Sequence, residues 1–145
     1  MIFCTVNGGS KEERQLVEDA FYFVVGELMP KKKNLDVEIW LTDMPYDDAD
    51  GYHLHVDKYE HNIELQTGLI EEDLVTALFH EMVHVRQSER GQMKDKGLIK
   101  IWDGVEYLSL YSTVDEYMSL PWEAEAYKLQ EELYTKWNQQ HLEYH

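Results

Sequence analysis

Stretches in which apolar and polar residues alternate predict the strands of this chain. Residues 2–6 form a short apolar, β-rich run, and the alternation over residues 35–41 is typical of a half-buried strand. Residues 51–57 and 61–66 indicate two further strands joined by a tight turn. The alternation in the second of these suggests a strand at the edge of a sheet, where an extended peptide can bind by strand addition.

Three longer segments have apolar residues at the spacing of an amphipathic helix. The first begins at a capping box formed by Ser10 and Glu13 and runs to about Met29. The second covers residues 71–90, with three acidic residues in its first turn and two arginines near its end, and the third opens at Pro121. The residues expected on the inner side of the first helix are Leu16, Ala20, Phe23, Val24 and Leu28.

A strong hairpin signal lies between the last two of these helices. Asp103-Gly104 separates residues 98–102 from residues 105–108, and a polar stretch over residues 92–96 precedes them. The 145 residues are enough for one domain with a real core but not for two. We therefore expect a compact α+β fold over residues 1–145, with a small mixed or antiparallel sheet packed on the N-terminal, central and C-terminal helices.

Composition narrows the range of partners. Lys and Arg number 13 against 29 Asp and Glu, and the formal charge of −16 disfavours direct binding to nucleic acid or to anionic membranes, whose phosphates it would repel. No apolar run of about 18 residues predicts a membrane span, and residues 1–6 do not resemble a signal peptide, so we expect a cytoplasmic protein. The single cysteine, Cys4, excludes an internal disulfide and a thiolate zinc site.

The central helix carries the most specific motif of the chain, His80-Glu81-Met82-Val83-His84. Helix positions four apart lie about 40° apart around the axis, so the two imidazoles can reach one metal ion. Glu81 points about 100° away from His80, where it can flank the ion as a general base without binding it. This His-Glu-x-x-His pattern is typical of zinc hydrolases.

A second histidine pair lies on the predicted strand over residues 51–57. His53 and His55 are two apart and share one face of that strand, which makes them a possible second metal pair. Alone this signal is weak, and two histidines at the surface of a strand are the better interpretation.

Two histidines leave a catalytic zinc site one protein ligand short. Such sites add one carboxylate and keep a fourth position open for water. The last helix offers Glu123 and Glu125, which are two apart and point to different sides, so only one of them is expected to reach the ion. The alternative for both is an acidic first turn that stabilises the helix.

On these residues the chain resembles a small gluzincin-type zincin, similar to the compact minigluzincins and to short metallopeptidases of the phage type. The resemblance covers about residues 63–133 and is carried by His80-Glu81-Met82-Val83-His84, by Val85-Arg86-Gln87 and by Pro121-Trp122-Glu123-Ala124-Glu125-Ala126. In immunity-repressor-type zincins an alanine follows the ligand glutamate by three residues, as Ala126 follows Glu123; other gluzincins place the alanine directly after it. The resemblance implies Glu123 as the third ligand of Zn²⁺, with Glu125 as the alternative.

The resemblance further implies a zinc-dependent peptidase with a peptide or protein substrate. Zinc would polarise the peptide carbonyl and activate a water, while Glu81 would take the proton of that water and pass it to the leaving amine. A tyrosine hydroxyl is suited to stabilise the oxyanion. Tyr111 and Tyr107 are the candidates, with core packing as the alternative role of both.

Two other classes of function compete with the peptidase. One is a zinc-binding protein of the same fold that binds a protein partner without cutting it, motivated by the absence of an evident subdomain for substrate selection. Glu81 disfavours this class, because a purely structural zinc site does not need that carboxylate. The other is a metal-free α+β domain in which the histidine pair is accidental.

Overall fold

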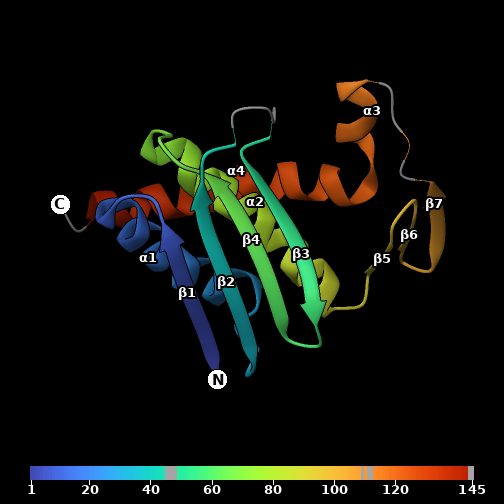
Figure 1. Cartoon of the computed structure of the whole chain (residues 1–145), viewed down its shortest axis with the longest axis horizontal. Coiled ribbons are helices and arrows are strands. Elements are labelled where there is room, and N and C mark those ends of the chain that lie inside the picture. The colour runs from blue at the N-terminus through green and yellow to red at the C-terminus, as the bar shows by residue number, and fades with distance from the viewer. Residues whose placement is uncertain (45–48, 109, 111–112, 144–145) are drawn as a thin grey trace.

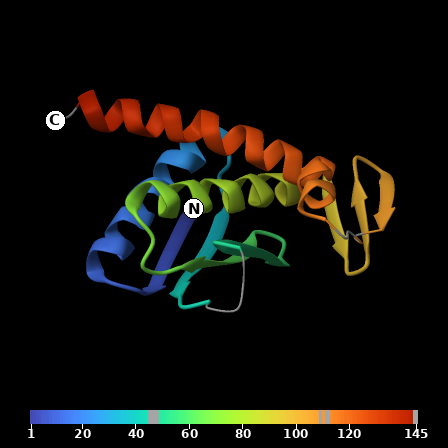
Figure 2. The same cartoon turned by 90° about the horizontal axis from the view of Figure 1, so that it is seen from above.

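The computed structural model describes residues 1–44, 49–108, 110 and 113–143, and most of them lie in three layers (Figures 1 and 2). A four-stranded sheet forms the first layer. Helices α1 (Lys11–Leu28) and α2 (Glu71–Glu89) cover one face of this sheet, and α4 (Pro121–Glu143) packs on the far side of α2. The predicted α+β class, with an N-terminal helix, a central helix and a C-terminal helix, is confirmed.

The main sheet is mixed. Its strands β1 and β2 run parallel to β4, while β3 pairs antiparallel with β4 and forms one edge. The prediction of an edge strand over residues 61–66 is wrong, because β4 lies between two other strands. Helices cover only one face of the sheet, so even an inner strand alternates between buried and solvated residues. In sheet order, the strands are β1 (Ile2–Gly8), β2 (Leu35–Thr42), β4 (Glu60–Gln66) and β3 (Gly51–Asp57).

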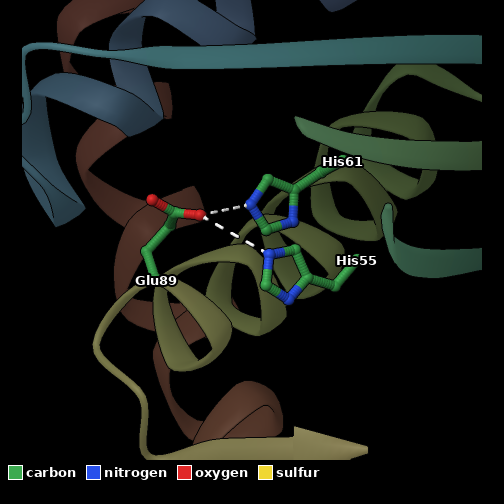
Figure 3. A group of neighbouring side chains, drawn as sticks. All are labelled: His55, His61 and Glu89. Carbon is green, nitrogen blue, oxygen red and sulfur yellow. Dashed lines mark hydrogen bonds and ion pairs between the residues drawn. The ribbon is translucent and has the colours of Figure 1, made fainter. Parts of the chain in front are cut away.

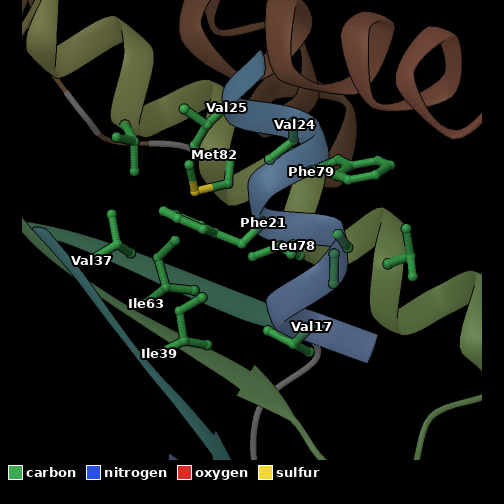
Figure 4. Packing of buried hydrophobic residues seen from close by; sticks show 14 of the residues in the cluster. Val17, Phe21, Val24, Val25, Val37, Ile39, Ile63, Leu78, Phe79 and Met82 are labelled. Atoms are coloured by element: carbon green, nitrogen blue, oxygen red, sulfur yellow. The ribbon is translucent and has the colours of Figure 1, made fainter. Parts of the chain in front are cut away.

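The hydrophobic core lies between the sheet and the two helices that cover it (Figure 4). Phe21 of α1, Ile39 of β2, Ile63 of β4 and Met82 of α2 are all fully buried there. Burial of each such side chain stabilises the fold by about 1.5–3 kcal/mol. The core therefore holds α2, which carries the histidine motif, rigidly against the sheet.

The capping box predicted at the start of α1 is confirmed. Glu13 N donates to Ser10 Oγ at 3.1 Å, and Ser10 N donates to Glu13 Oε1 at 2.9 Å. The inner face of the helix differs from the prediction, because Leu16 and Phe23 are only partly buried at the margin of the core. Phe23 faces α4 instead, where its ring lies 5.3 Å from that of Trp137. The buried residues of α1 are Val17, Ala20, Phe21, Val24, Val25 and Leu28.

A small three-stranded antiparallel sheet lies beyond the end of α2 (Figure 1). The predicted hairpin is confirmed, with Asp103 and Gly104 at φ angles of 48° and 81° in its turn. The polar stretch over residues 92–96 contains a strand, because a largely exposed sheet does not require an apolar face. A short helix that was not predicted, α3 (Val114–Ser119), leads into α4. The strands are β5 (Met93–Lys96), β6 (Ile99–Trp102) and β7 (Val105–Leu108).

Candidate metal centre

Helix α2 places His80, Glu81 and His84 between the sheet and α4. The segment contains no Gly or Pro, so it remains one regular helix, and the two imidazoles lie one turn apart with ring centroids separated by 5.0 Å. His80 and Glu81 are buried, and His84 is half-buried. Because α2 is covered on both sides, these polar groups need partners from within the protein.

Glu123 of α4 supplies that partner. Its Oε1 lies 2.8 Å from Nε2 of His80, and its Oε2 lies 3.3 Å from Nε2 of His84. One donor atom from each of the three residues lies within 4.8 Å of the others, so the group could hold a metal ion. Helix α4 begins at Pro121, and its first turn places Glu123 on the side of α4 that faces α2.

Two glutamines orient the imidazoles. Oε1 of Gln130 lies 2.7 Å from Nδ1 of His80, and Oε1 of Gln87 lies 2.8 Å from Nδ1 of His84. Since an amide oxygen only accepts hydrogen bonds, each Nδ1 donates its proton and each Nε2 faces the carboxylate between them. Glu125 lies outside this group: its carboxylate accepts a hydrogen bond from Nε2 of Gln87 at 3.1 Å.

A cation is needed at the point where these three groups meet. If both imidazoles were neutral with the proton on Nδ1, the two Nε2 atoms and the carboxylate would all be acceptors, so a proton or a metal ion must lie among them. Desolvation lowers the pKa of His84, but the hydrogen bond to Glu123 and the charges of Glu81 and Glu123 raise it to about 9. Desolvation likewise raises the pKa of Glu123, but hydrogen bonds to His80 and His84 lower it to about 2. The donor set of two imidazoles and one carboxylate fits zinc.

Glu81 lies beside this cluster without joining it. Burial raises the pKa of its carboxyl above the ordinary value, because desolvation disfavours the charged form. Gly51, the first residue of the edge strand β3, allows this close packing, since a Cβ at that position would lie 3.1 Å from Cγ of Glu81. The carboxyl is therefore held between α2 and the edge of the sheet.

The cluster opens into a cleft of about 910 Å³. Glu81, His84 and Glu123 lie in its wall, together with the first five residues of β3 and with β5. A cleft of this size is within the range of ligand-binding sites. The acidic and imidazole groups are thus accessible to a ligand that lies along the edge strand.

Tyr117 of α3 also lines the cleft, and the sequence did not single it out for a role. Its hydroxyl donates a hydrogen bond to the carboxylate of Glu123, and burial together with the Glu123 charge raises its pKa. The sequence does contain a signal for α3, since Thr113 is followed three residues later by Glu116. Oγ1 of Thr113 accepts a hydrogen bond from Glu116 N at 3.1 Å and caps the helix.

Of the two tyrosines that were predicted as candidates, Tyr107 lies outside the wall of this cleft. Tyr107 is half-buried on β7 and packs edge-on against Trp122, with ring centroids 5.6 Å apart. Tyr111 lies outside the described residues. Gln130 was also missed, because nothing in a helical pattern indicates that a glutamine seven residues after Glu123 will contact a histidine on another helix.

The histidine pair on β3 differs from the expected two surface side chains. His53 is half-buried, and its Nε2 lies 2.8 Å from Nδ1 of His61 on β4. His55 is exposed but lies beside His61 and Glu89, and these three residues form a second group that could hold a metal ion. The surface interpretation is therefore wrong for His53, because β4 and α2 pack around it.

No protein-family model, curated protein or solved structure matches this chain. Every helix among the described residues is too short or too polar to cross a membrane. Cys4 is partly buried, and burial raises the pKa of its thiol to about 12, which disfavours the reactive thiolate. The groups with the clearest chemistry are therefore the two clusters of histidine and glutamate.

Proposed function

We propose that this protein is a zinc-dependent metallopeptidase of the gluzincin type. The observation that carries the proposal is the convergence of His80, His84 and Glu123 beside the buried Glu81. Structural zinc sites are closed by four protein ligands, whereas catalytic sites use three and leave a position open. Among the described residues, no fourth His, Cys, Asp or Glu joins this group.

His80, His84 and Glu123 would hold the zinc ion, which would act as a Lewis acid that polarises a carbonyl and lowers the pKa of water. Glu81 accepts a proton from water as the new C–O bond forms, and it donates that proton to the amine nitrogen as the C–N bond breaks. The hydroxyl of Tyr117, which donates to Glu123 in this structure, would turn to donate its hydrogen bond to the oxyanion that forms on the peptide carbonyl.

An extended peptide is the substrate class that best suits this cleft. β3 is an edge strand, and the first five of its residues line the cleft beside Glu81. A peptide that pairs with this strand by backbone hydrogen bonds would lie along it in an extended conformation. Gly51 would then keep the peptide backbone close to the carboxyl of Glu81.

Cleavage of a varied peptide pool by purified protein supplied with zinc, followed by mass spectrometry, tests the proposal. Glu81→Gln should retain zinc but lose about 10²–10⁴-fold in rate, because it removes the base and not a ligand. Glu64→Gln makes the same chemical change on the exposed face of β4 and should leave the rate unchanged. A protein that takes up no zinc, or equal cleavage by Glu81→Gln, would contradict the peptidase assignment.

Partner binding without cleavage is the second candidate, and the outer face of the main sheet favours it. Trp40 and Tyr52 flank Glu64 in one row of paired residues, and both aromatic side chains are exposed. Phe3 and Leu54 are exposed on the same face. Large exposed apolar residues that cluster in this way are typical of interaction surfaces. A fully zinc-loaded protein that cleaves no peptide but captures a partner through this face would support this candidate.

A further inference from the structure

A second cluster of possible metal ligands lies at the C-terminal end of α2 (Figure 3). His55 of β3, His61 of β4 and Glu89 of α2 point toward one another. Nε2 of His61 lies 2.7 Å from Oε2 of Glu89, and Nε2 of His55 lies 4.0 Å from the same oxygen. One donor atom from each residue lies within 4.8 Å of the others, which is the arrangement that a single cation requires.

The fold holds two of these three side chains in place. The side chains of His61 and Glu89 are 0% and 4% exposed, whereas that of His55 is 39% exposed. The rings of His55 and His61 stack with centroids 4.6 Å apart and an interplanar angle of 9°, and the Nε2 atoms of both are directed at Oε2 of Glu89 (Figure 3). The cluster is rigid on its inner side and open to solvent at His55, which gives an ion a path of entry.

His53 contacts the ring nitrogen of His61 that faces away from Glu89. Its Nε2 lies 2.8 Å from Nδ1 of His61, so a hydrogen on that Nδ1 has an acceptor and Nε2 of His61 is left available to a metal. Metal-binding histidines commonly have such a partner on their second ring nitrogen. The ring of His53 also stacks on that of His84 at 6.3 Å, so the two clusters are neighbours along one cleft.

An ion pair with Lys32 is the competing explanation for this cluster. The ammonium of Lys32 contacts Oε1 of Glu89, so the buried carboxylate already has a cationic partner. That contact leaves Oε2 to the histidines. Lys32 accounts for the burial of Glu89, but it does not account for two parallel imidazoles that are directed at one oxygen.

We infer that His55, His61 and Glu89 bind a second divalent transition-metal ion of the zinc class. Imidazole nitrogen and carboxylate oxygen are ligands that zinc accepts, and this site shares no ligand with the proposed catalytic centre. The three ligands come from β3, β4 and α2. A bound ion therefore fastens the edge strand that lines the cleft to the end of the metal-binding helix.

Titration of the metal-free protein with Zn²⁺ against a chromogenic chelator counts the ions bound by each chain. We expect two equivalents for the unmodified protein and one for His55→Ala, whose exposed side chain can be removed without opening the core. Loss of this ligand should lower the affinity for the second ion by more than the roughly 10–100-fold that is typical when a hydrogen-bond partner of a ligand is lost. Asp57→Asn, an exposed change on the same strand, should keep both equivalents.

Two further variants separate this site from the catalytic centre and from the ion pair. Glu123→Gln should lose one equivalent and keep the one that His55→Ala removes. Lys32→Gln should keep two equivalents and bind the second more tightly, because a positive charge beside Glu89 is removed. If only His55→Ala lowers the count, the second site stands and the proposed catalytic centre fails. The second site is overturned if the unmodified protein binds one ion only and Glu123→Gln abolishes that binding. It is also overturned if His55→Ala binds as many ions as the unmodified protein.

Discussion

At the residue scale, amide oxygens rather than carboxylates orient the two histidines of the proposed catalytic centre. Gln87 and Gln130 each accept a hydrogen bond from an Nδ1 atom and so select the ring form whose Nε2 can bind a metal. An amide does this without adding negative charge. The charge at the centre is therefore set by Glu123, which faces both imidazoles, and by Glu81 beside them.

Exchange of Glu123 or of Glu125, the first two acidic residues of α4, for glutamine should have unequal effects on zinc binding. Glu123→Gln removes an anionic ligand, so we expect the affinity at this centre to fall by more than about 100-fold. Glu125→Gln is the matched control. Its carboxylate contacts Gln87, an outer partner, so we expect a loss of no more than about 10-fold. Zn²⁺ titration with a competing chelator measures the affinity of both variants. A larger loss of affinity in Glu125→Gln than in Glu123→Gln would identify Glu125 as the ligand.

Removal of the Tyr117 hydroxyl should affect turnover but not zinc content. Tyr117→Phe deletes one donor to the oxyanion, and such a loss typically lowers kcat by about 10²–10³-fold. Tyr107→Phe removes the same atom from a ring that packs on Trp122 outside the catalytic cluster, and it should leave kcat unchanged. Steady-state kinetics with one cleaved peptide from the pool measures kcat for both variants. An unchanged kcat in Tyr117→Phe would restrict the hydroxyl to its hydrogen bond with Glu123.

At the element scale, the first turn of α1 also fixes the turn that precedes α2. The carboxylate of Glu13 closes the capping box with Ser10 and accepts two further hydrogen bonds, from Thr67 Oγ1 at 2.8 Å and from Gly68 N at 3.0 Å. Gly68 has a φ of 83°, which suits glycine, and this turn connects β4 to α2. One carboxylate thus joins the start of α1 to the entry of α2.

The contribution of Glu13 to stability should depend on pH. Hydrogen bonds from the backbone of Gly68 and Ser10 lower its pKa below the ordinary value of 4.5. A carboxyl with a lowered pKa in the folded state stabilises the protein fully above its unfolded pKa, and that stability is lost as the pH falls through the folded pKa.

Urea denaturation at several pH values measures this dependence. We expect Glu13→Gln to be less stable by about 1 kcal/mol at pH 7, because hydrogen bonds to a charged acceptor are stronger than those to a neutral amide oxygen. The difference from the unmodified protein should shrink below pH 4.5. Glu12→Gln removes the same charge one residue before Glu13, from a side chain that takes no part in the capping box. Its effect on the free energy of unfolding should be smaller and less dependent on pH. Equal behaviour of the two variants would argue against the role of Glu13.

At the scale of the whole molecule, α4 joins the core to the site. Trp137 near its end packs on Phe23 of α1 and Phe79 of α2, with ring centroids 5.3 Å and 6.2 Å apart. Glu123 and Gln130, nearer its start, contact the histidines of α2. A single helix therefore carries an aromatic anchor in the core and two groups of the metal centre.

Removal of the anchor should weaken both stability and metal binding. Trp137 is 7% exposed, and Trp137→Ala should lower the free energy of unfolding by about 3–5 kcal/mol. Zinc affinity should also fall, because α4 is less firmly held, although Trp137 lies outside the metal centre. Trp40→Ala, at a 43% exposed position on the outer face of the sheet, should cost less than about 1 kcal/mol. Urea denaturation and Zn²⁺ titration of both variants compare these effects, and equal losses of stability would contradict the anchoring role.

Features that depend on neighbours in the sequence could be predicted from the sequence alone. The capping box of Ser10 and Glu13, the hairpin at Asp103-Gly104 and the start of α4 at Pro121 all follow from local backbone and hydrogen-bond preferences. The adjacency of His80 and His84 follows from helical geometry in the same way. These signals were sufficient to predict the α+β class and the motif around which the proposed function is built.

Features that depend on how distant elements pack were decided only by the tertiary structure. The rotation of α4 against α2 brings Glu123, and not Glu125, to the histidines, and it brings Gln130 with it. Strand order places β3 at the edge and β4 inside the sheet, although both alternate similarly in sequence. The same packing gathers His55, His61 and Glu89 from three elements. Local patterns carry no information on such contacts, because they arise from the burial of side chains that lie far apart along the chain.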